Sequence, residues 1–170
     1  MILYHLNSGR RWRNGILTAA GLLFYAFGSL QGLLMLILFA LINFTCGILI
    51  QRRKAPRLTA AAAITFNLLF LCFFKYLHFF PEDTLLQWQA AVPLGISFFT
   101  FKAISYIADT LRKPENGTQN FGTFLLYLSF LPEAACGPIS RFSDFESQLL
   151  KERICRTPEG LRRFTAGLSK

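Results

Sequence analysis

The sequence predicts an all-α, multi-pass transmembrane helical bundle with a re-entrant element, and three observations support that class. Hydrophobic residues make up 53% of the 170 residues, charged residues only 16%, and phenylalanine alone occurs 19 times. An ordinary soluble domain has a different composition. The apolar residues are also clustered, since no charged residue occurs between Gly15 and Gln51. The 18 basic residues stand in short groups between apolar runs, as in cytoplasmic loops at a membrane surface. We therefore expect the lipid bilayer as a partner and no nucleic acid.

Four apolar stretches are long enough to be membrane spans. A basic group before the first stretch could indicate a signal peptide, but a second apolar run follows at once and no polar mature domain appears. If the first two spans form a hairpin, the basic groups that flank them lie on one side, which the positive-inside rule makes cytoplasmic. The fourth span returns to that side with Arg112 and Lys113. The predicted spans cover residues 14–30, 32–50, 58–76 and 93–111.

The next apolar segment, residues 121–140, differs from the spans because it contains Pro132, Glu133, Gly137 and Pro138. A regular spanning helix here would lose backbone hydrogen bonds and would hold an acid at membrane depth. The basic residues that follow are expected to stay cytoplasmic, so the segment must enter and leave on one side. We predict a re-entrant element that lines a cavity open to the cytoplasm.

Residues 143–170 are predicted to form helices on the cytoplasmic surface, and they complete a single membrane domain that covers residues 1–170. Ser143 and Glu146 fit a capping box, and Phe145 with Leu149 gives the first of these helices an apolar face. We expect that face to lie on the membrane surface.

The fourth span carries the candidate site residues. At helical spacing Lys102, Ser105 and Asp109 share one face. A central lysine costs about 2.5 to 3.5 kcal/mol on insertion, so we predict that Lys102 faces protein rather than lipid. Lys102 and Asp109 are two helical turns apart, about 10 Å. We interpret these residues as lining a cavity or as structural, with binding of an anionic donor phosphate as the alternative.

We interpret four polar residues outside the fourth span as structural. Glu133 and Arg141 flank the Gly-Pro break and could form a buried ion pair that holds the re-entrant element in shape; acid–base work by Glu133 is the less favoured alternative. Asn43 and Asn67 lie inside spans and are predicted to hydrogen-bond between helices.

The sequence predicts no metal site. The two histidines, His5 and His78, lie far apart, and neither neighbours a cysteine. The cysteines show no metal-ligand spacing, and we interpret them as small apolar residues.

Two stretches of the sequence closely resemble the signature of the membrane-bound O-acyltransferase (MBOAT) family, in its bacterial branch of alginate O-acetyltransferases. They are PLGISFFTFKAISYIADTLR, which begins at residue 93, and NFGTFLLYLSFLPEAACGPISRFSDFESQL, which begins at residue 120. The resemblance extends to RWRNGILTAAGLLFYAFG near the start and FLCFFKYLHFF in the middle. The family usually has Gln or Glu where this chain has Lys102.

The resemblance implies a place in the bacterial inner membrane and transfer of an acyl group, acetyl by preference, to hydroxyls of an extracytoplasmic polysaccharide. The donor would be acetyl-CoA or an acyl carrier, and no cofactor would stay bound. The family reaction is thought to need an embedded histidine as base, because a hydroxyl is a poor nucleophile until a positioned group removes its proton. That histidine lies in the later half of the family fold, beyond Lys170, and neither His5 nor His78 replaces it. We therefore expect an N-terminal part of such an enzyme, inactive alone and without a catalytic residue.

Two other functions stay open on the sequence alone. The chain could be a non-enzymatic membrane subunit or scaffold that works with a separately encoded catalytic half or with an extracytoplasmic acetyl-transfer partner. It could also be a small transporter whose pathway uses Lys102, Asp109 and Glu133.

Overall fold

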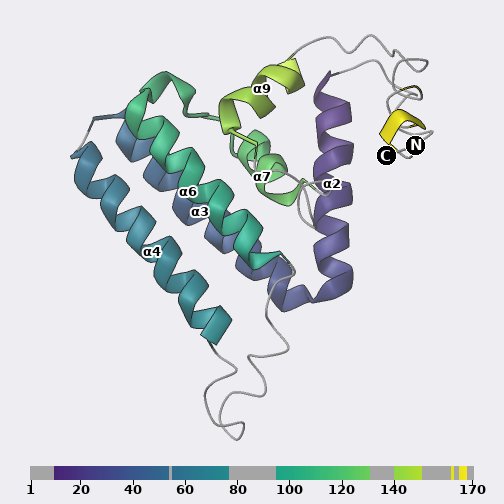
Figure 1. Cartoon of the computed structure of the whole chain (residues 1–170), viewed down its shortest axis with the longest axis horizontal. Helices are drawn as coiled ribbons and strands as arrows, with labels where there is room; N and C mark the ends of the chain where they lie inside the picture. Colours follow the sequence, from purple (N-terminus) through teal and green to yellow (C-terminus); the bar gives the residue numbers. More distant parts are fainter. Residues whose placement is uncertain are drawn as a thin grey trace, which may run out of the picture.

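The computed structural model describes residues 10–53, 55–76, 95–130, 140–150, 162 and 165–167, and every element within them is helical. This confirms the all-α class for the described part of the chain. In Figure 1, α3, α4 and α6 lie side by side, and α7 and α9 lie between α6 and the upright α2. The elements are α2 (Arg10–Gly28), α3 (Leu30–Gln51), α4 (Pro56–Tyr76), α6 (Ile96–Arg112), the 3₁₀ helix η2 (Pro114–Asn116), α7 (Phe121–Ser129) and α9 (Phe142–Leu150).

The ends of α2, α3 and α4 follow from local chemistry. Helix α2 begins at Arg10, earlier than the span predicted from residue 14, because arginine favours helix and extends it beyond the apolar run. Ser29 separates α2 from α3: its backbone is extended, and its hydroxyl accepts a hydrogen bond from the Gly32 amide at 3.3 Å. Pro56 opens α4, where its missing N–H is not needed.

Helix α6 is shorter than its predicted span. It starts at Ile96, after Gly95 adopts a left-handed backbone with φ 74°, which glycine allows without steric cost. It ends at Arg112 and has 17 residues. Residues 93 and 94 lie outside the described part of the chain.

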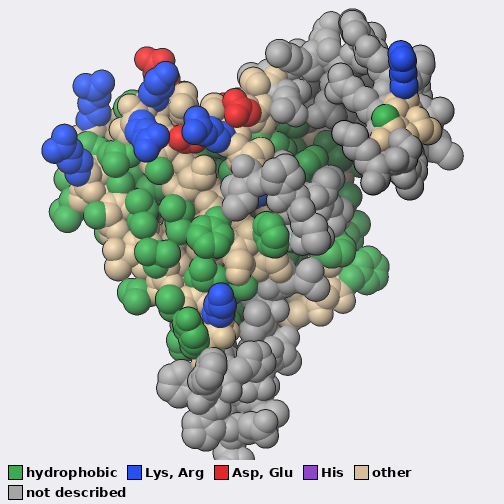
Figure 2. Space-filling model, in the orientation of Figure 1, with side chains coloured by type: hydrophobic (Ala, Val, Ile, Leu, Met, Phe, Trp, Pro, Cys, Tyr) green, Lys and Arg blue, Asp and Glu red, His purple; other side chains and the backbone are tan. Residues whose placement is uncertain are grey.

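Helices α3 and α4 are long and apolar enough to cross a membrane by length and composition. The core helix of a soluble protein passes the same test, but such a helix is mostly buried, whereas only about a third of the apolar window of each helix is buried here (33% and 28%). Leu34, Leu38 and Leu69 are 60%, 61% and 65% exposed. Figure 2 shows hydrophobic side chains over the flank formed by α4 and α6, with Lys and Arg gathered at one end. Apolar surface of this extent suits lipid better than water, so the described fold indicates a membrane location. Crossing by α2 and α6 stays a prediction.

Aromatic and amide side chains join the three adjacent helices. Phe39 of α3 packs at 5.0 Å from the ring of Phe70 and at 5.1 Å from the ring of Phe99, between ring centroids. The side-chain nitrogen of Asn43 donates to Asn67 Oδ1 at 3.0 Å, and that of Asn67 donates to Asn43 Oδ1 at 2.7 Å. The predicted hydrogen bonding of Asn43 and Asn67 between helices is therefore confirmed.

Glycines set two close helix contacts. A Cβ atom at Gly47 of α3 would lie 2.6 Å from Cε1 and from the hydroxyl oxygen of Tyr106 on α6. A Cβ atom at Gly21 of α2 would lie 2.5 Å from the carbonyl oxygen of Ser129 on α7. Small residues therefore let these helices approach more closely than any larger side chain would.

The segment predicted to be re-entrant begins with α7 and then leaves the helix. Asn120 caps the start of α7, where its side chain accepts from the Gly122 amide at 3.0 Å. After Ser129 the backbone of Phe130 is extended, so the regular helix ends ahead of Pro132. Residues 131–139 lie outside the described residues, and the return of the segment to one side of the membrane stays a prediction.

Helix α9 corrects two expectations. It begins at Phe142, so Ser143 lies inside the first turn and the predicted capping box is wrong. The physical reason is packing: Phe142 is fully buried, at 5.2 Å from the ring of Tyr106 and 5.3 Å from the ring of Tyr127. Phe145 also packs against Tyr127 at 5.3 Å. The apolar face of this helix therefore packs on protein rather than on the membrane surface.

Candidate functional site

The junction of α6, α7 and α9 contains a buried cation. Lys102 of α6 is 1% exposed, which confirms that its side chain faces protein. Its ammonium nitrogen Nζ donates a hydrogen bond of 3.0 Å to the carbonyl oxygen of Tyr127 on α7. The same nitrogen lies 5.1 Å from the centroid of the Tyr127 ring.

This contact places a positive charge where α7 needs one. The last four carbonyl groups of a helix have no partner within the helix, and they carry the negative end of its dipole. The Tyr127 carbonyl belongs to this last turn, because α7 ends at Ser129. The ammonium group of Lys102 therefore compensates the carboxyl end of α7, and the face of the Tyr127 ring adds a cation–π attraction, about 2 kcal/mol when desolvated.

Tyr127 also connects α7 to the chain beyond the break. Its hydroxyl donates to the carbonyl oxygen of Ser140 at 2.7 Å. Its ring packs against Phe142 and Phe145 of α9. One tyrosine thus contacts Lys102 and fixes the residues on both sides of the segment that the structure does not describe.

The other predicted residues of α6 do not join this contact. Ser105 and Asp109 are half-buried. Among the described residues no hydrogen bond reaches Asp109 Oδ2, and no ion pair links Asp109 to Lys102. The lysine instead extends toward the end of α7. The hydroxyl groups of Tyr106 and Ser129 are likewise buried without a hydrogen-bond partner in the described part of the chain.

Of the predicted ion pair between Glu133 and Arg141, the structure describes only the arginine. Arg141 is exposed just ahead of α9, and Glu133 lies outside the described residues. The proposed ion pair between them stays a prediction.

The described residues offer a structural arrangement rather than an obvious reactive centre. Within the described ranges no three His, Cys, Asp or Glu side chains gather as a metal site would require. Cys46 is a half-buried free thiol and Cys72 is an exposed one. The sequence indicated that Lys102 is buried, but nothing in it indicated the acceptor, because every residue carries a carbonyl group. Fold and site together define a helical membrane protein whose apolar interior is held by a few buried polar contacts.

Comparison with known proteins finds homologues of the chain. The protein named probable alginate O-acetylase AlgI of Pseudomonas aeruginosa is 30% identical over 185 residues, an alignment of 99% of this chain and 35% of that protein. The protein of the same name from Azotobacter vinelandii is 28% identical over 99% of this chain and 37% of its own length. The peptidoglycan O-acetyltransferase of Helicobacter pylori is 28% identical over 91% of this chain and 37% of its own length.

The chain is therefore a homologue, along nearly its whole length, of the N-terminal third of the alginate O-acetylases of the membrane-bound O-acyltransferase family. It spans about a third of the length of these relatives. No protein-family model matches the chain. No solved structure matches it.

Proposed function

We propose that the chain forms the first helical part of a membrane-bound O-acyltransferase that transfers an acyl group, acetyl in the first instance, to hydroxyls of an extracytoplasmic polysaccharide. The observation that carries this proposal is the alignment of 99% of the chain with relatives named as alginate O-acetylases. A relative named as a peptidoglycan O-acetyltransferase supports O-acetyl transfer as the shared reaction and leaves the acceptor polymer open.

In this proposal the chain contributes the frame of the enzyme. The buried Lys102 fixes the end of α7, with which the predicted re-entrant segment, residues 121–140, begins. A fixed helix end holds the first half of that segment in one position, and transfer reactions gain from groups held in a fixed geometry. The donor, acetyl-CoA or an acyl carrier, would approach from the cytoplasm. The base that removes the proton of the acceptor hydroxyl would come from the remainder of the enzyme.

A chimera tests this proposal. The matched first third of the Pseudomonas aeruginosa relative is replaced by this chain, and acetyl groups on alginate are measured in cells that lack their own O-acetylase. We expect acetylation clearly above that of cells with an empty vector. The 170-residue chain expressed alone should give none.

Two controls define the outcome. The parent relative sets full activity, and Lys102→Met in the chimera should reduce acetylation at least tenfold, because the end of α7 loses its partner. A chimera that reaches the membrane in parental amounts and leaves alginate unacetylated would contradict the proposal. Activity of the isolated chain would show that the base lies within these 170 residues.

A further inference from the structure

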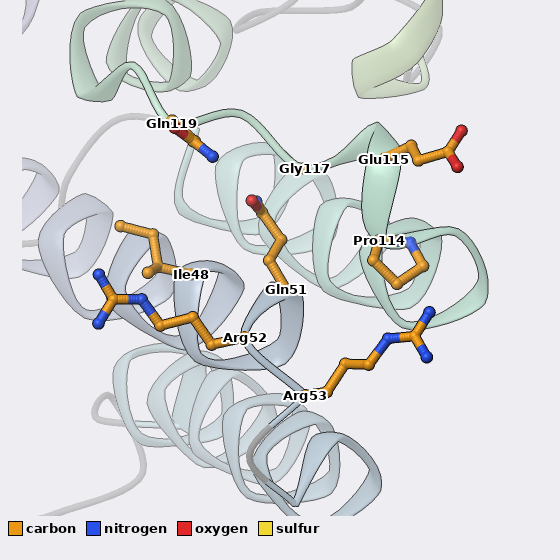
Figure 3. A pocket seen from close by; sticks show the side chains of 8 residues that line it. All are labelled: Ile48, Gln51, Arg52, Arg53, Pro114, Glu115, Gly117 and Gln119. Atoms are coloured by element: carbon orange, nitrogen blue, oxygen red, sulfur yellow. The ribbon is translucent and has the colours of Figure 1, made fainter.

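A pocket of about 660 Å³ opens where α3 ends, between α3 and the η2 turn. Figure 3 shows Gln51 directed into the space between the two elements, with the guanidinium groups of Arg52 and Arg53 extending to opposite sides. Its walls combine an apolar side chain from α3 with polar and charged groups. The lining residues are Ile48, Gln51, Arg52, Arg53, Pro114, Glu115, Gly117 and Gln119.

The pocket has a fixed shape on its inner side. The side-chain nitrogen of Gln51 donates to the carbonyl oxygen of Thr118 at 3.4 Å, which ties α3 to the loop after η2. Gly117 lies so close to Gln51 that a Cβ atom there would overlap the Gln51 amide. The turn that presents the arginines is also tight, since Arg53 and Ala55 have positive φ angles of 55° and 46°. The two arginines therefore stand beside a preformed hollow.

Positive charge dominates this end of the bundle. Figure 2 shows Lys and Arg gathered there, beside a few acidic side chains. The carboxyl-terminal ends of α3 and α6 add partial negative charge, which opposes the binding of an anion. An anion can bind here because the positive charge of the side chains exceeds this partial negative charge. The cations are exposed side chains from the ends of three helices, namely Arg52, Arg53, Arg57, Arg112 and Lys113.

The position of the pocket selects the class of anion. Ile48 and Leu49 belong to the apolar stretch of α3, and Leu49 is exposed. One turn further on, the two arginines follow directly after the end of α3 at Gln51. If α3 spans the bilayer, this change from apolar to basic residues falls at the headgroup layer, where phosphates of one leaflet lie. Arginine forks match phosphate oxygens with two parallel hydrogen bonds.

We infer that this pocket binds the phosphate of an anionic phospholipid headgroup from the leaflet around the arginine-bearing end of the bundle. The guanidinium groups of Arg52 and Arg53 provide positive charge on either side of the pocket, and the Gln51 and Gln119 amides and the Glu115 carboxylate complete its polar wall. The inference needs α3 to cross the membrane but does not depend on acyl transfer.

The experiment uses the full chain in lipid nanodiscs of phosphatidylcholine, with and without phosphatidylglycerol, and measures the thermal unfolding midpoint. A lipid that binds the folded protein raises that midpoint, and we expect a rise of about 3 °C at low salt, the shift that roughly 1 kcal/mol gives in a protein of this size. Arg52→Gln with Arg53→Gln should remove at least half of the rise. Arg112→Gln with Lys113→Gln removes the same charge from the same end outside the pocket and should keep most of it.

Two outcomes of this experiment would contradict the inference. Equal losses in the two double variants would show diffuse surface charge rather than a pocket. An equal rise with inorganic phosphate in pure phosphatidylcholine discs would show a site for soluble phosphate. If the Arg52 and Arg53 variant does not fold, native mass spectrometry of the unmodified chain decides: it should retain phosphatidylglycerol about tenfold over phosphatidylcholine, and equal retention contradicts the site.

Discussion

The contact between α3 and α4 and the contact between α6 and α7 both bury polar groups in an apolar bundle, but they differ in what those groups depend on. Asn43 and Asn67 are neutral and exchange hydrogen bonds with each other. Lys102 is a full charge whose acceptor is the end of another helix. The amide pair is nearly complete in itself, whereas the described hydrogen bond of the lysine goes to a backbone group of α7.

This difference determines what each contact costs when it is broken. Removing both members of a neutral pair leaves no unpaired group, and the change can be almost neutral. Removing a buried cation takes away the donor of a hydrogen bond to a helix-end carbonyl group, and an unpaired polar group in apolar surroundings is costly. The α6–α7 junction should therefore be the more vulnerable of the two contacts.

The largest effect is expected for Lys102→Met. The substitution keeps the length of the side chain but removes its hydrogen bond to the Tyr127 carbonyl and its contact with the ring. We expect a loss of about 3 kcal/mol in the free energy of unfolding, measured by denaturant titration in micelles. Lys75→Met is the matched control, since Lys75 is exposed at the far end of α4, and it should change the stability by less than about 0.5 kcal/mol. If Lys102→Met lowered the free energy of unfolding as little as Lys75→Met, the α6–α7 contact would not be the more vulnerable one.

Gly47→Ala tests whether close approach, rather than polar bonding, holds α3 against α6. The new methyl group would lie 2.6 Å from atoms of the Tyr106 ring, so the helices must separate. We expect a loss of about 2 kcal/mol, typical of overpacking, in the same titration. Gly15→Ala meets nothing within 4 Å and should instead stabilise helix α2, by up to about 1 kcal/mol. A loss for Gly15→Ala as large as that for Gly47→Ala would refute the steric explanation.

A double-mutant cycle on the amide pair gives a smaller effect. Asn43→Leu leaves the Asn67 amide unpaired and should cost about 1 kcal/mol, within the range measured for hydrogen bonds between membrane helices. The double variant with Asn67→Leu should cost less than the sum of the two single variants, because no orphaned amide remains. Strict additivity of the three unfolding free energies would show that the two side chains do not interact.

The smallest effect concerns Glu146 on α9, outside the predicted spans. Burial raises the pKa of this carboxyl above its ordinary value of 4.5. The folded state then binds more protons than the unfolded state between these two pKa values, so the free energy of unfolding should fall as pH rises through that window. Glu146→Gln should flatten this part of the pH profile, and a profile that rises there in the unmodified chain would contradict the assignment.

The sequence was sufficient to predict the helices and the burial of Lys102, for a simple reason. Apolar length and the cost of a charge in lipid act on each segment by itself, so they can be judged from residue types alone. The acceptor of Lys102 lies 25 residues away and is a backbone carbonyl, so no residue type marks it. The start of α9 could not be predicted either, because the burial of Phe142 outweighs the local preference of Ser143 for a cap.

The hydrogen bond from the Tyr127 hydroxyl to the Ser140 carbonyl joins residues 13 positions apart. It therefore closes a loop of the chain through one side chain. Closing such a loop costs entropy that grows only with the logarithm of its length, so extra residues between the two anchors would add a few tenths of a kcal/mol. One hydroxyl group therefore joins the last turn of α7 to a residue two positions ahead of α9.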